Sequence, residues 1–552
     1  MSSKRHKITI SALVLLTAGM IVSTELITER LFPVLPASIA LCMGIILVAY
    51  YGRDRLVGPL LLAGIVVSVH LLWMAAFGSS MIGTDPDKVA LWTQAMIEEE
   101  SLSGTQEHST FYAAAPVFLI LAAFASLILD TTIRYGFLIY PLLVGFLLPM
   151  MTAAVVSRVW RSKDAALVAG ILSMTMAQTV MYSFTQIPQN AAVFLWAGFT
   201  LAAVLYLAGI VDKNRSLVLL TVFLGAAIHT HKISVLVLFG GVATLLVATF
   251  LLMRLPVELK DQNIKPASTM FASVAMVSGL GLVVQWEWIT EYTDRAVGRV
   301  LAMTTTPSGL EEYEYTTALA LNSDVLSIAS YSAHLVASLG VAGICWLIIA
   351  RTDYYREPVI GLLSFCAFIA ALTVFSVFGP IANGRILFYA EPLLAIIIGG
   401  GIAIKLGPRK SLVVVAIFAF ITLQLFVAPA TPDYPDTSRS YLTENEVTAK
   451  SWGETHGTAG IYTDQRYSRE NLPSNIAQHE DPDTYRSLDD EIFEGDLNTS
   501  EYNCVAFRDR PQDIHSSEHG TFIWTWDVEG YVANNYGQVH TTGDVNHYCS
   551  GP

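Results

Sequence analysis

The sequence has 552 residues, of which 53% are hydrophobic and 14% are charged, and its net charge is −14. It contains many apolar runs near the length of about 20 residues that crosses a bilayer as a helix. This composition excludes a water-soluble globular chain and indicates a polytopic membrane protein, and we expect no nucleic-acid partner.

The N-terminus, MSSKRHKITISALVLLTAGMIVST, has a basic start followed by an apolar run. No small-residue cleavage site follows, so we interpret the run as a retained first span rather than a removed signal peptide. A second apolar run lies at 31–50. We assign residues 1–55 to two N-terminal transmembrane helices.

Fourteen apolar runs are candidate transmembrane helices. They lie at roughly 8–25, 31–50, 56–78, 114–129, 135–157, 165–185, 191–211, 216–230, 233–253, 268–290, 326–350, 358–379, 386–404 and 411–430. If all of them crossed, the basic clusters after residue 130 would face outside, against the rule that Lys and Arg accumulate in cytoplasmic loops. If the run 114–129 does not cross, 18 of the 32 Lys and Arg residues lie inside. We therefore predict about 13 spans with a cytoplasmic N-terminus.

This topology gathers the polar loops on the outer face of the membrane. The first is a large outer loop, 79–134, in which the short run 114–129 becomes a helix lying in the membrane surface. The others are TQIPQN, HTHK, the long loop 291–324 and GPIANGR, whereas the inner loops are mostly short and basic. We expect the functional site at the outer surface.

Two carboxylates stand near the start of the large outer loop, in IGTDPDKVALW. Asp85 is a good helix N-cap, with Pro86 at the first helical position and Asp87 in the first turn, where the helix dipole favours an anion. A carboxylate at the membrane boundary is also suited to act as a general base or metal ligand for a substrate presented from the bilayer. Capping and catalysis are compatible, because one acid suffices for the cap.

Three features of residues 56–405 occur together: an Asp directly after a transmembrane helix, a short apolar outer helix in HSTFYAAAPVFLILAAF, and a span ending in cytoplasmic SRVWRSKDAALVAGIL. In this layout the chain resembles the C-type glycosyltransferase superfamily, which includes the dolichyl-phosphate-mannose mannosyltransferases and related archaeal enzymes. The resemblance implies many transmembrane helices around an outer cavity, a polyprenyl-phosphate-linked sugar as donor, and Asp85 as the base, with Asp87 as the second candidate. We assign residues 56–430 to this glycosyltransferase module.

The spacing Asp85-Pro86-Asp87 also matches the D-x-D pattern of metal-dependent glycosyltransferases. A divalent metal held by Asp85 and Asp87 is therefore an open alternative. The sequence itself requires no cofactor.

Arg385, in IANGRILFYAEP, stands at the outer mouth of a span. An Arg on the outer side is unusual under the positive-inside rule, and the positive end of the helix dipole repels its charge. A bound anion would compensate both effects. A lipid phosphate would supply one through paired hydrogen bonds, and the resemblance implies an Arg near this point for the donor phosphate. The alternative is a side chain that extends to lipid headgroups.

His229, His231 and Lys232 follow a short span. Residues two apart on a helix point in nearly opposite directions, so the two histidines would not chelate one metal ion. The resemblance implies a histidine lining the cavity, which makes His229 and Lys232 candidate contacts for the donor phosphate. The alternative is anchoring at the membrane interface.

Two outer loops offer sugar or acceptor contacts. Gln186, Gln189 and Asn190 in SFTQIPQN supply uncharged hydrogen-bonding groups suited to sugar hydroxyls, although the proline in this stretch also fits an ordinary turn. Arg295 and Arg299 lie four apart on one face of a helix, where they would steer an anionic headgroup or meet lipid phosphate.

Residues 431–552 hold 22 of the 46 Asp and Glu residues but only 7 of the 32 Lys and Arg residues. A helical pattern runs from Glu444 to Trp452, and GIYTD, NCVAFR and TFIWTWDV are strand-like. We predict a small acidic α/β domain outside the cytoplasm. It contains Cys504 and Cys549, and the sequence leaves open whether they form a disulfide.

These features predict an all-α polytopic membrane protein that is similar to C-type glycosyltransferases and carries a small C-terminal α/β domain. We expect an inverting enzyme of the cell membrane that transfers a sugar, with mannose as a candidate, from a polyprenyl or dolichyl phosphate to a glycan, protein or lipid acceptor. The W-W-D-Y-G-type run of oligosaccharyltransferases and the Pro-Pro pair of mannosyltransferase loops are absent, which favours single-sugar transfer and leaves the donor open.

The alternatives are a transporter or lipid flippase, and an inactive scaffold with the same fold. A transporter should place ionisable groups or broken helices near the middle of the bilayer, often in repeated halves. Glu391 is the main charged residue within the predicted spans, and the chain has no internal repeat.

Overall fold

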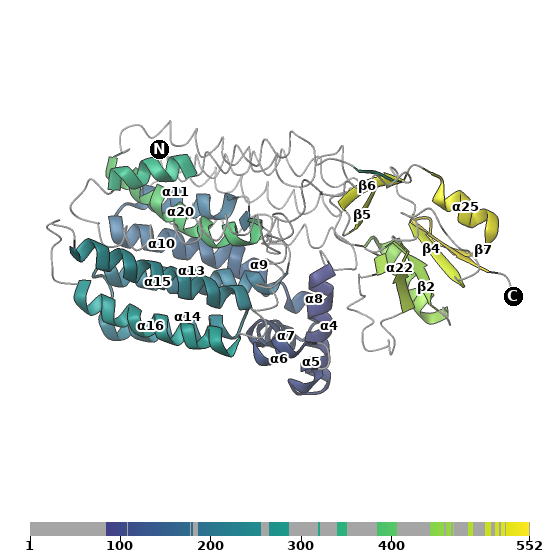
Figure 1. Ribbon diagram of the computed structural model, residues 1–552, viewed down its shortest axis with the longest axis horizontal. Coiled ribbons are helices and arrows are strands. Elements are labelled where there is room, and N and C mark those ends of the chain that lie inside the picture. The colour runs from purple at the N-terminus through teal and green to yellow at the C-terminus, as the bar shows by residue number, and fades with distance from the viewer. Residues whose placement is uncertain are drawn as a thin grey trace, which may run out of the picture.

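The structure is a computed structural model. It describes a helical region between residues 84 and 405 and a C-terminal region from residue 442, each with gaps (Figure 1). The described residues are 84–106, 109–176, 178–179, 186–254, 264–285, 318–320, 339–349, 383–405, 442–456, 460–464, 467–468, 484–488, 503–508, 514–517, 520–524 and 526–550.

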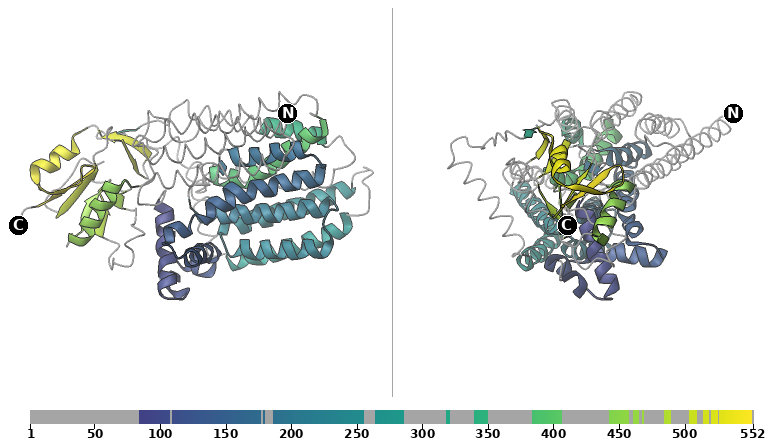
Figure 2. Two further views of the ribbon diagram at one scale, coloured as in Figure 1. Left: turned by 180° about the vertical axis from the view of Figure 1, so that it is seen from behind. Right: turned by 90° about the vertical axis from the view of Figure 1, so that its right-hand side faces the viewer.

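The described part of the chain up to residue 405 is mostly helical. Its first elements are α4 (Thr84–Glu98), α5 (Ser103–Gln106), α6 (Thr110–Ala114), α7 (Val117–Leu129), α8 (Ile133–Gly136), α9 (Ile139–Pro141) and a π-helical turn, η1 (Leu142–Leu147). The long helices that follow are α10 (Leu148–Trp160), α11 (Lys163–Thr175), α13 (Pro188–Leu207), α14 (Lys213–Ile228), α15 (Lys232–Arg254), α16 (Ile264–Val284) and α20 (Asn383–Lys405). The long helices lie side by side as a bundle, and α4–α8 gather at one end of it (Figures 1 and 2).

Three described helices are long and apolar enough to cross a membrane: Leu142–Trp160, Pro188–Leu207 and Leu387–Ile404. Shorter apolar helices of the described part are Val117–Leu129, Ser234–Thr244, Ala272–Val284 and Leu339–Ile349. The chain therefore has the helices of a multi-pass membrane protein. The predicted spans at 8–25, 31–50, 56–78, 358–379 and 411–430 lie outside the described residues, so the number of spans stays a prediction.

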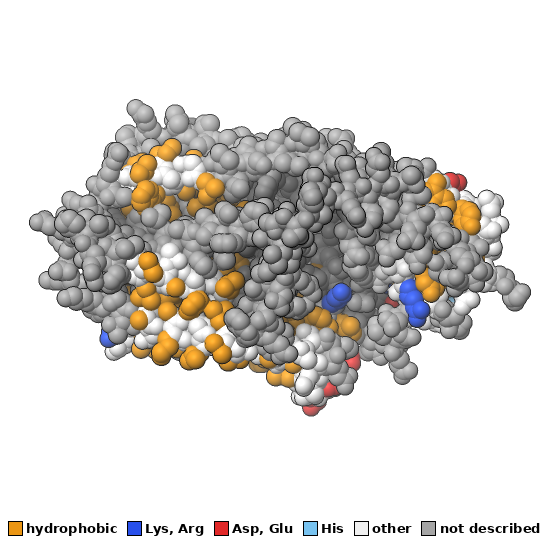
Figure 3. Space-filling view, viewed as in Figure 1, with side chains coloured by type: hydrophobic (Ala, Val, Ile, Leu, Met, Phe, Trp, Pro, Cys, Tyr) orange, Lys and Arg blue, Asp and Glu red, His pale blue; other side chains and the backbone are white. Residues whose placement is uncertain are grey.

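Large apolar side chains are exposed along α14 and α16. They include Val218, Val222, Met276, Leu280, Val283 and Val284. Figure 3 shows hydrophobic side chains spread over this face of the bundle rather than gathered in one small patch. Exposing so much apolar surface to water would be unfavourable. Lipid tails can cover the same surface favourably, as expected for a membrane-embedded bundle.

Glycines of α20 allow this helix to approach its neighbours closely. A Cβ atom on Gly400 would lie 2.5 Å from the Trp160 ring, and one on Gly399 would lie 3.0 Å from the Ala165 carbonyl oxygen. The C-terminal half of α20 therefore packs against the end of α10 and the start of α11, as small residues allow in membrane helices.

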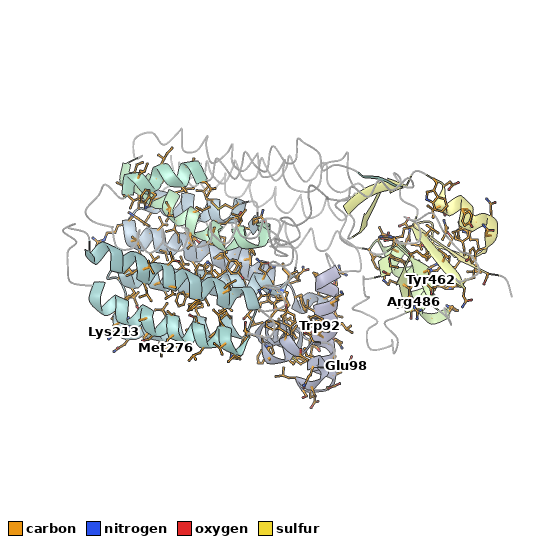
Figure 4. The ribbon with its side chains drawn as sticks, in the orientation of Figure 1. Trp92, Glu98, Lys213, Met276, Tyr462 and Arg486 are labelled. Carbon is orange, nitrogen blue, oxygen red and sulfur yellow. A yellow bond between two sulfur atoms is a disulfide. The ribbon has the colours of Figure 1, made fainter. Side chains whose placement is uncertain are left out.

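This packing places basic residues together. Arg158, Lys163 and Lys405 stand at the ends of these three helices, and all three belong to loops predicted to be cytoplasmic. Figure 4 shows Lys213 at the end of the bundle remote from Trp92 and Glu98 of α4. The predicted inner loops thus share one end, while the side of the membrane on which they lie stays a prediction.

The run 114–129 forms the short helix predicted from its length. Helix α7 has 13 residues, which span about 20 Å, less than the roughly 30 Å core of a bilayer. It begins after Pro116 and ends at Asp130 in the left-handed conformation. Phe118 and Ala122 are buried, whereas the side chain of Ile128 is 71% exposed. An apolar helix too short to span, with one face buried on the protein and the other exposed, fits a position at the membrane surface.

Helix α4 begins two residues earlier than the N-cap interpretation predicts. Its first residue is Thr84, so Asp85 lies within the first turn instead of capping it, and Pro86 is the third helical residue instead of the first. Proline is still tolerated there, because the first four N–H groups of a helix have no partner within it.

The C-terminal region contains a five-stranded mixed sheet with strand order β3-β2-β4-β8-β7. Its strands are β2 (Ile461–Thr463), β3 (Tyr485–Ser487), β4 (Cys504–Arg508), β7 (Gly537–Thr541) and β8 (Val545–Cys549), and its helices are α22 (Glu444–His456) and α25 (Val528–Asn535). Strands β2, β3 and β4 are parallel, whereas β4, β8 and β7 are antiparallel. The predicted α/β character, the helix from Glu444 and the strands in GIYTD and NCVAFR are confirmed.

Buried charge fixes α22 to this sheet. Arg508 of β4 donates through Nε and Nη2 to the Asp464 carboxylate at 2.8 and 2.5 Å, and Nη1 lies 3.5 Å from Glu446 Oε1. Glu446 also accepts the Thr443 N–H, and the Thr443 hydroxyl accepts the Glu446 N–H, which forms a capping box at the start of α22.

A second sheet joins the tail to the long outer loop. Strand β1 (Ala318–Ala320) of loop 291–324 pairs antiparallel with β6 (Gly520–Trp524), which also pairs with β5 (Ile514–Ser517). Because β1 and β6 are joined strand to strand, the loop and the C-terminal domain lie on the same side of the membrane. The predicted topology also places them on one side. Strand β6 confirms the strand predicted in TFIWTWDV.

Cys504 and Cys549 form a disulfide, which the sequence left open. They face each other in register on the antiparallel strands β4 and β8. We expect reduction to lower the unfolding free energy of the C-terminal domain by about 2–4 kcal/mol, because the bond closes a loop of 45 residues. Thermal unfolding with and without reductant measures this loss. Reductant should have no further effect on Cys504→Ser, and an equal shift in that variant would contradict the expectation.

A buried histidine makes the same domain sensitive to acid. His547 packs against Trp452, and its Nε2 atom lies 3.3 Å from the Tyr485 hydroxyl. Burial, and secondly the neighbouring His540, lowers the pKa of His547 from 6.5 to about 4. Below pH 6.5 the unfolded chain binds a proton that the folded domain does not, so the stability present above pH 6.5 is lost as the pH falls toward 4.

We expect this loss to be about 3 kcal/mol between pH 6.5 and 4. Hydrogen exchange at α22 and β8 in the full chain, corrected for intrinsic exchange rates, measures it. The variant His547→Gln lacks the titrating group and should have a flatter profile over this range. A profile as steep as that of the wild type would show that another group causes the loss.

Candidate functional site

The predicted outer loop 79–134 and the bundle share a hydrophobic core at one end of the bundle. Val89 of α4, Phe118 of α7 and Tyr140 of α9 are buried together with Ala191, which lies in the first turn of α13. The Tyr140 hydroxyl also donates to the Phe118 carbonyl oxygen. The start of α13, with Gln189 and Asn190, is therefore held against the helices of the loop.

The turn between α14 and α15 lies at the same end. The Val117 N–H at the start of α7 donates to the His229 carbonyl oxygen at 2.9 Å. His229 Nδ1 lies 3.3 Å from the Ala114 carbonyl oxygen, which can only accept, so this nitrogen carries the hydrogen. From the other side, Gln285 Nε2 donates to the Ile228 carbonyl oxygen at 2.6 Å.

Helix α20 meets both α13 and α15 through Tyr389. Trp196 Nε1 of α13 donates to the Tyr389 carbonyl oxygen at 2.9 Å. The Tyr389 hydroxyl lies 3.3 Å from the hydroxyl of Ser234, a residue near the start of α15. All three residues are fully buried, so these contacts fix the N-terminal half of α20 relative to its two neighbours.

The carboxylate of Glu391 joins α20 to the residues that follow α11. Oε1 accepts the Gln178 N–H at 2.8 Å, and Oε2 accepts the Thr179 N–H at 2.6 Å and the Thr179 hydroxyl at 2.7 Å. Glu391 is 7% exposed. Three donors thus compensate a carboxylate buried within an apolar helix.

The predicted site residues fall on these elements. Asp85 and Asp87 lie in the first turn of α4, Gln189 and Asn190 in the first turn of α13, Gln186 just before α13, His229 in the turn after α14, Lys232 at the first residue of α15, and Arg385 in the first turn of α20. Gln186, Gln189 and Asn190 are buried and His229 is exposed. The structure brings the backbones of all these positions to one end of the bundle.

Several predicted side chains are not described. The side chains of Asp85, Asp87, Lys232 and Arg385 lie outside the described residues, although their helices are placed. Arg295 and Arg299 lie outside the described residues altogether. Their assignments stay predictions.

Among the described helices, α4, α13, α15 and α20, which bear predicted site residues, begin at this end of the bundle. The N-terminus of a helix carries a partial positive charge and unpaired N–H groups, which favour a bound anion. The buried amides beside them supply uncharged donors and acceptors. The arrangement is therefore suited to hold an anionic group together with hydroxyl groups.

Two polar residues at this end of the bundle were not predicted as site residues, because the sequence presents each span separately. Gln285 directly follows α16, and its Oε1 atom is buried without a hydrogen-bond partner in the described part of the chain. The sequence identifies Glu391 as a charged residue within a predicted span, but it does not predict the contacts of Glu391 with residues 178 and 179. A polar residue near the end of an apolar run was the available signal in both cases.

The described residues contain no group of three or more His, Cys, Asp or Glu side chains that could hold a metal ion. The side chains of Asp85 and Asp87 are not among them, so a divalent metal at the D-x-D stretch stays a prediction.

No protein-family model matches the chain, and no curated protein sequence does. Solved structures do align with it. ArnT from Cupriavidus metallidurans is 10% identical, with a TM-score of 0.46 in the apo state and 0.47 bound to undecaprenyl phosphate, over 89% of this chain and 98% or 99% of that protein. Arabinofuranosyltransferase AftD from Mycobacteria is 12% identical, with a TM-score of 0.47, over 89% of this chain but only 41% of that protein.

Proposed function

We propose that this protein is a membrane glycosyltransferase that transfers a sugar from a polyprenyl-phosphate carrier to an acceptor hydroxyl at the outer surface of the membrane. The observation that carries the proposal is that the starts of α4, α13, α15 and α20 and the His229 turn lie at the same end of the bundle (Figure 1). These elements bear Asp85, Arg385, Lys232 and the buried amides. A base, a cationic phosphate site and sugar-binding groups are the parts that this reaction needs.

In the proposed mechanism Asp85 removes the proton from the acceptor hydroxyl. The acceptor oxygen attacks the anomeric carbon of the sugar from the face opposite the phosphate, and the bond between that carbon and the phosphate oxygen breaks. The configuration at the anomeric carbon inverts. Arg385 and Lys232 stabilise the negative charge that develops on the departing lipid phosphate.

The neighbouring groups have supporting roles in this proposal. Gln186, Gln189 and Asn190 hydrogen-bond to sugar or acceptor hydroxyls, and His229 contacts the donor phosphate. Helix α7 rests on the outer lipid surface, from which a polyprenyl carrier arrives. Mannose is a candidate sugar, and a glycan, protein or lipid is a candidate acceptor.

The satisfied contacts of Glu391 favour an enzyme over a transporter. A coupling residue of a transporter must release and bind an ion or proton. Both oxygens of Glu391 are instead engaged by backbone N–H groups and a hydroxyl. Such a carboxylate is better suited to hold two segments together than to carry a cargo.

Incubation of the purified protein with radiolabelled polyprenyl-phosphate sugars and a panel of acceptors tests the proposal. A glycosyltransferase releases the carrier phosphate and labels an acceptor. A flippase moves the donor across a vesicle membrane without cleaving it, and a scaffold does neither. Absence of carrier release for every donor offered would count against an enzyme.

A further inference from the structure

Glu391 lies deep in the fold, and the proposed reaction does not use it directly. It belongs to the stretch of α20 that is long and apolar enough to cross a membrane. A charge in such a place is unfavourable unless it is well partnered, and ionisable residues within spans usually have a function. The three hydrogen bonds from Gln178 and Thr179 explain how the carboxylate is tolerated, but not what it does.

The next residue explains why support is needed here. Pro392 lies inside α20. Proline has no N–H to donate within the helix, and its ring crowds the preceding turn, so the helix is weakened at this point. Arg385 lies in the turns on the outer side of this weak point. The direction of those turns therefore depends on contacts with neighbouring elements.

Two sets of contacts supply that support. Tyr389 is tied to α13 through Trp196 and to α15 through Ser234. Glu391 is tied to Gln178 and Thr179, the segment that leads to the start of α13. Both sets lie between the proline and the outer end of the helix.

We propose that Glu391 is a positioning residue that fixes the outer turns of α20, and with them Arg385, for the donor phosphate. The inference rests on the proposed function, because it acts through Arg385. Glu391 makes and breaks no covalent bond. Its carboxylate is required as an acceptor of backbone N–H groups, which a neutral amide of the same size cannot replace on both sides.

The variants Glu391→Gln and Thr179→Val test this role. Gln places an NH₂ group against a backbone N–H, and Val removes the hydroxyl donor. We expect the donor KM to rise about tenfold in Glu391→Gln and about threefold in Thr179→Val, with kcat changed by less than about threefold. Because the two residues share one interaction, the double variant should be no worse than Glu391→Gln alone.

Binding of undecaprenyl phosphate, measured directly on each purified variant, should weaken by the same factors. Thr152→Val is the matched control, because Thr152 is a buried threonine of α10 whose hydroxyl donates to the Leu148 carbonyl oxygen at 2.9 Å. It should lose thermal stability without a change in donor KM. If Glu391→Gln fails to fold, the donor KM and the undecaprenyl phosphate binding of Thr179→Val test the positioning role instead.

Arg385→Ala separates the two levels of the inference. If Arg385→Ala binds undecaprenyl phosphate as the wild type does, the proposed donor site is wrong. If Arg385→Ala loses binding while folded Glu391→Gln and Thr179→Val keep it, only the positioning role is wrong. An equal rise of the donor KM in Thr152→Val would also overturn the positioning role, because a general loss of packing would then explain the effect.

Discussion

Replacement of Asp85 by Asn should reduce the rate of sugar transfer by about 100- to 10,000-fold while the protein stays folded. Asparagine has the shape of aspartate but cannot accept the proton of the acceptor hydroxyl. Asparagine and aspartate also have similar helix propensities, so α4 should remain intact. The initial rate of carrier release measures the effect, and the thermal midpoint of unfolding shows whether the fold is kept.

Two other carboxylates of α4 serve as controls for Asp85→Asn. Asp87→Asn should reduce the rate by less than about tenfold, because Asp87 is assigned to an auxiliary role. Glu98→Gln, at the exposed C-terminal end of the same helix, should leave the rate unchanged. Transfer at the wild-type rate in the double variant Asp85→Asn, Asp87→Asn would show that neither residue is the base.

Removal of the guanidinium in Arg385→Ala should raise the donor KM by about 10- to 100-fold, which corresponds to the loss of hydrogen bonds to a charged group. Arg385→Lys should recover part of the affinity, because lysine keeps the charge but not the paired hydrogen bonds. Steady-state kinetics with varied donor at saturating acceptor measures both values. The acceptor KM should change much less than the donor KM.

The matched control for Arg385 is an arginine at the opposite end of the bundle. Arg158→Ala removes an exposed guanidinium near the C-terminal end of α10 and should leave the donor KM unchanged. A donor KM unchanged in Arg385→Ala, or raised equally in both variants, would refute the assignment of Arg385 to the donor phosphate.

Local features of the fold followed from the sequence where length and pattern decide structure. The run 114–129 is too short to cross a bilayer and is bounded by Pro116 and Asp130, and α7 has these limits. The strands in GIYTD and NCVAFR follow from short strand-like runs between polar turns. Both depend on neighbours in the sequence, so a single chain suffices to predict them.

Long-range contacts did not follow from the sequence. Glu391 and Thr179 are 212 residues apart, and the carboxylate bonds to main-chain N–H groups, which every residue except proline has. The side-chain types at positions 178 and 179 therefore give no indication that a buried carboxylate binds there. The same holds for β1 and β6, since the pairing of short strands is set by the main chain and by tertiary position.

The start of α4 illustrates a smaller limit. Asp85 and Pro86 form a good cap and first helical pair, yet the helix begins at Thr84. Threonine, aspartate and proline all suit a helix start, so their order alone does not fix the first residue. The assignment of Asp85 as a base does not depend on this difference, because both acids remain in the first turn.

The pairing of β1 with β6 has a consequence for how the protein is made. The ribosome completes Ala318–Ala320 long before Gly520–Trp524, so the edge of β1 must stay unpaired until the tail has been made and has reached the same side of the membrane. The C-terminal domain is therefore not a detachable appendage. A chain truncated after residue 430 would leave β1 without its partner, and the tail expressed alone would expose one edge of β6, a form prone to aggregation.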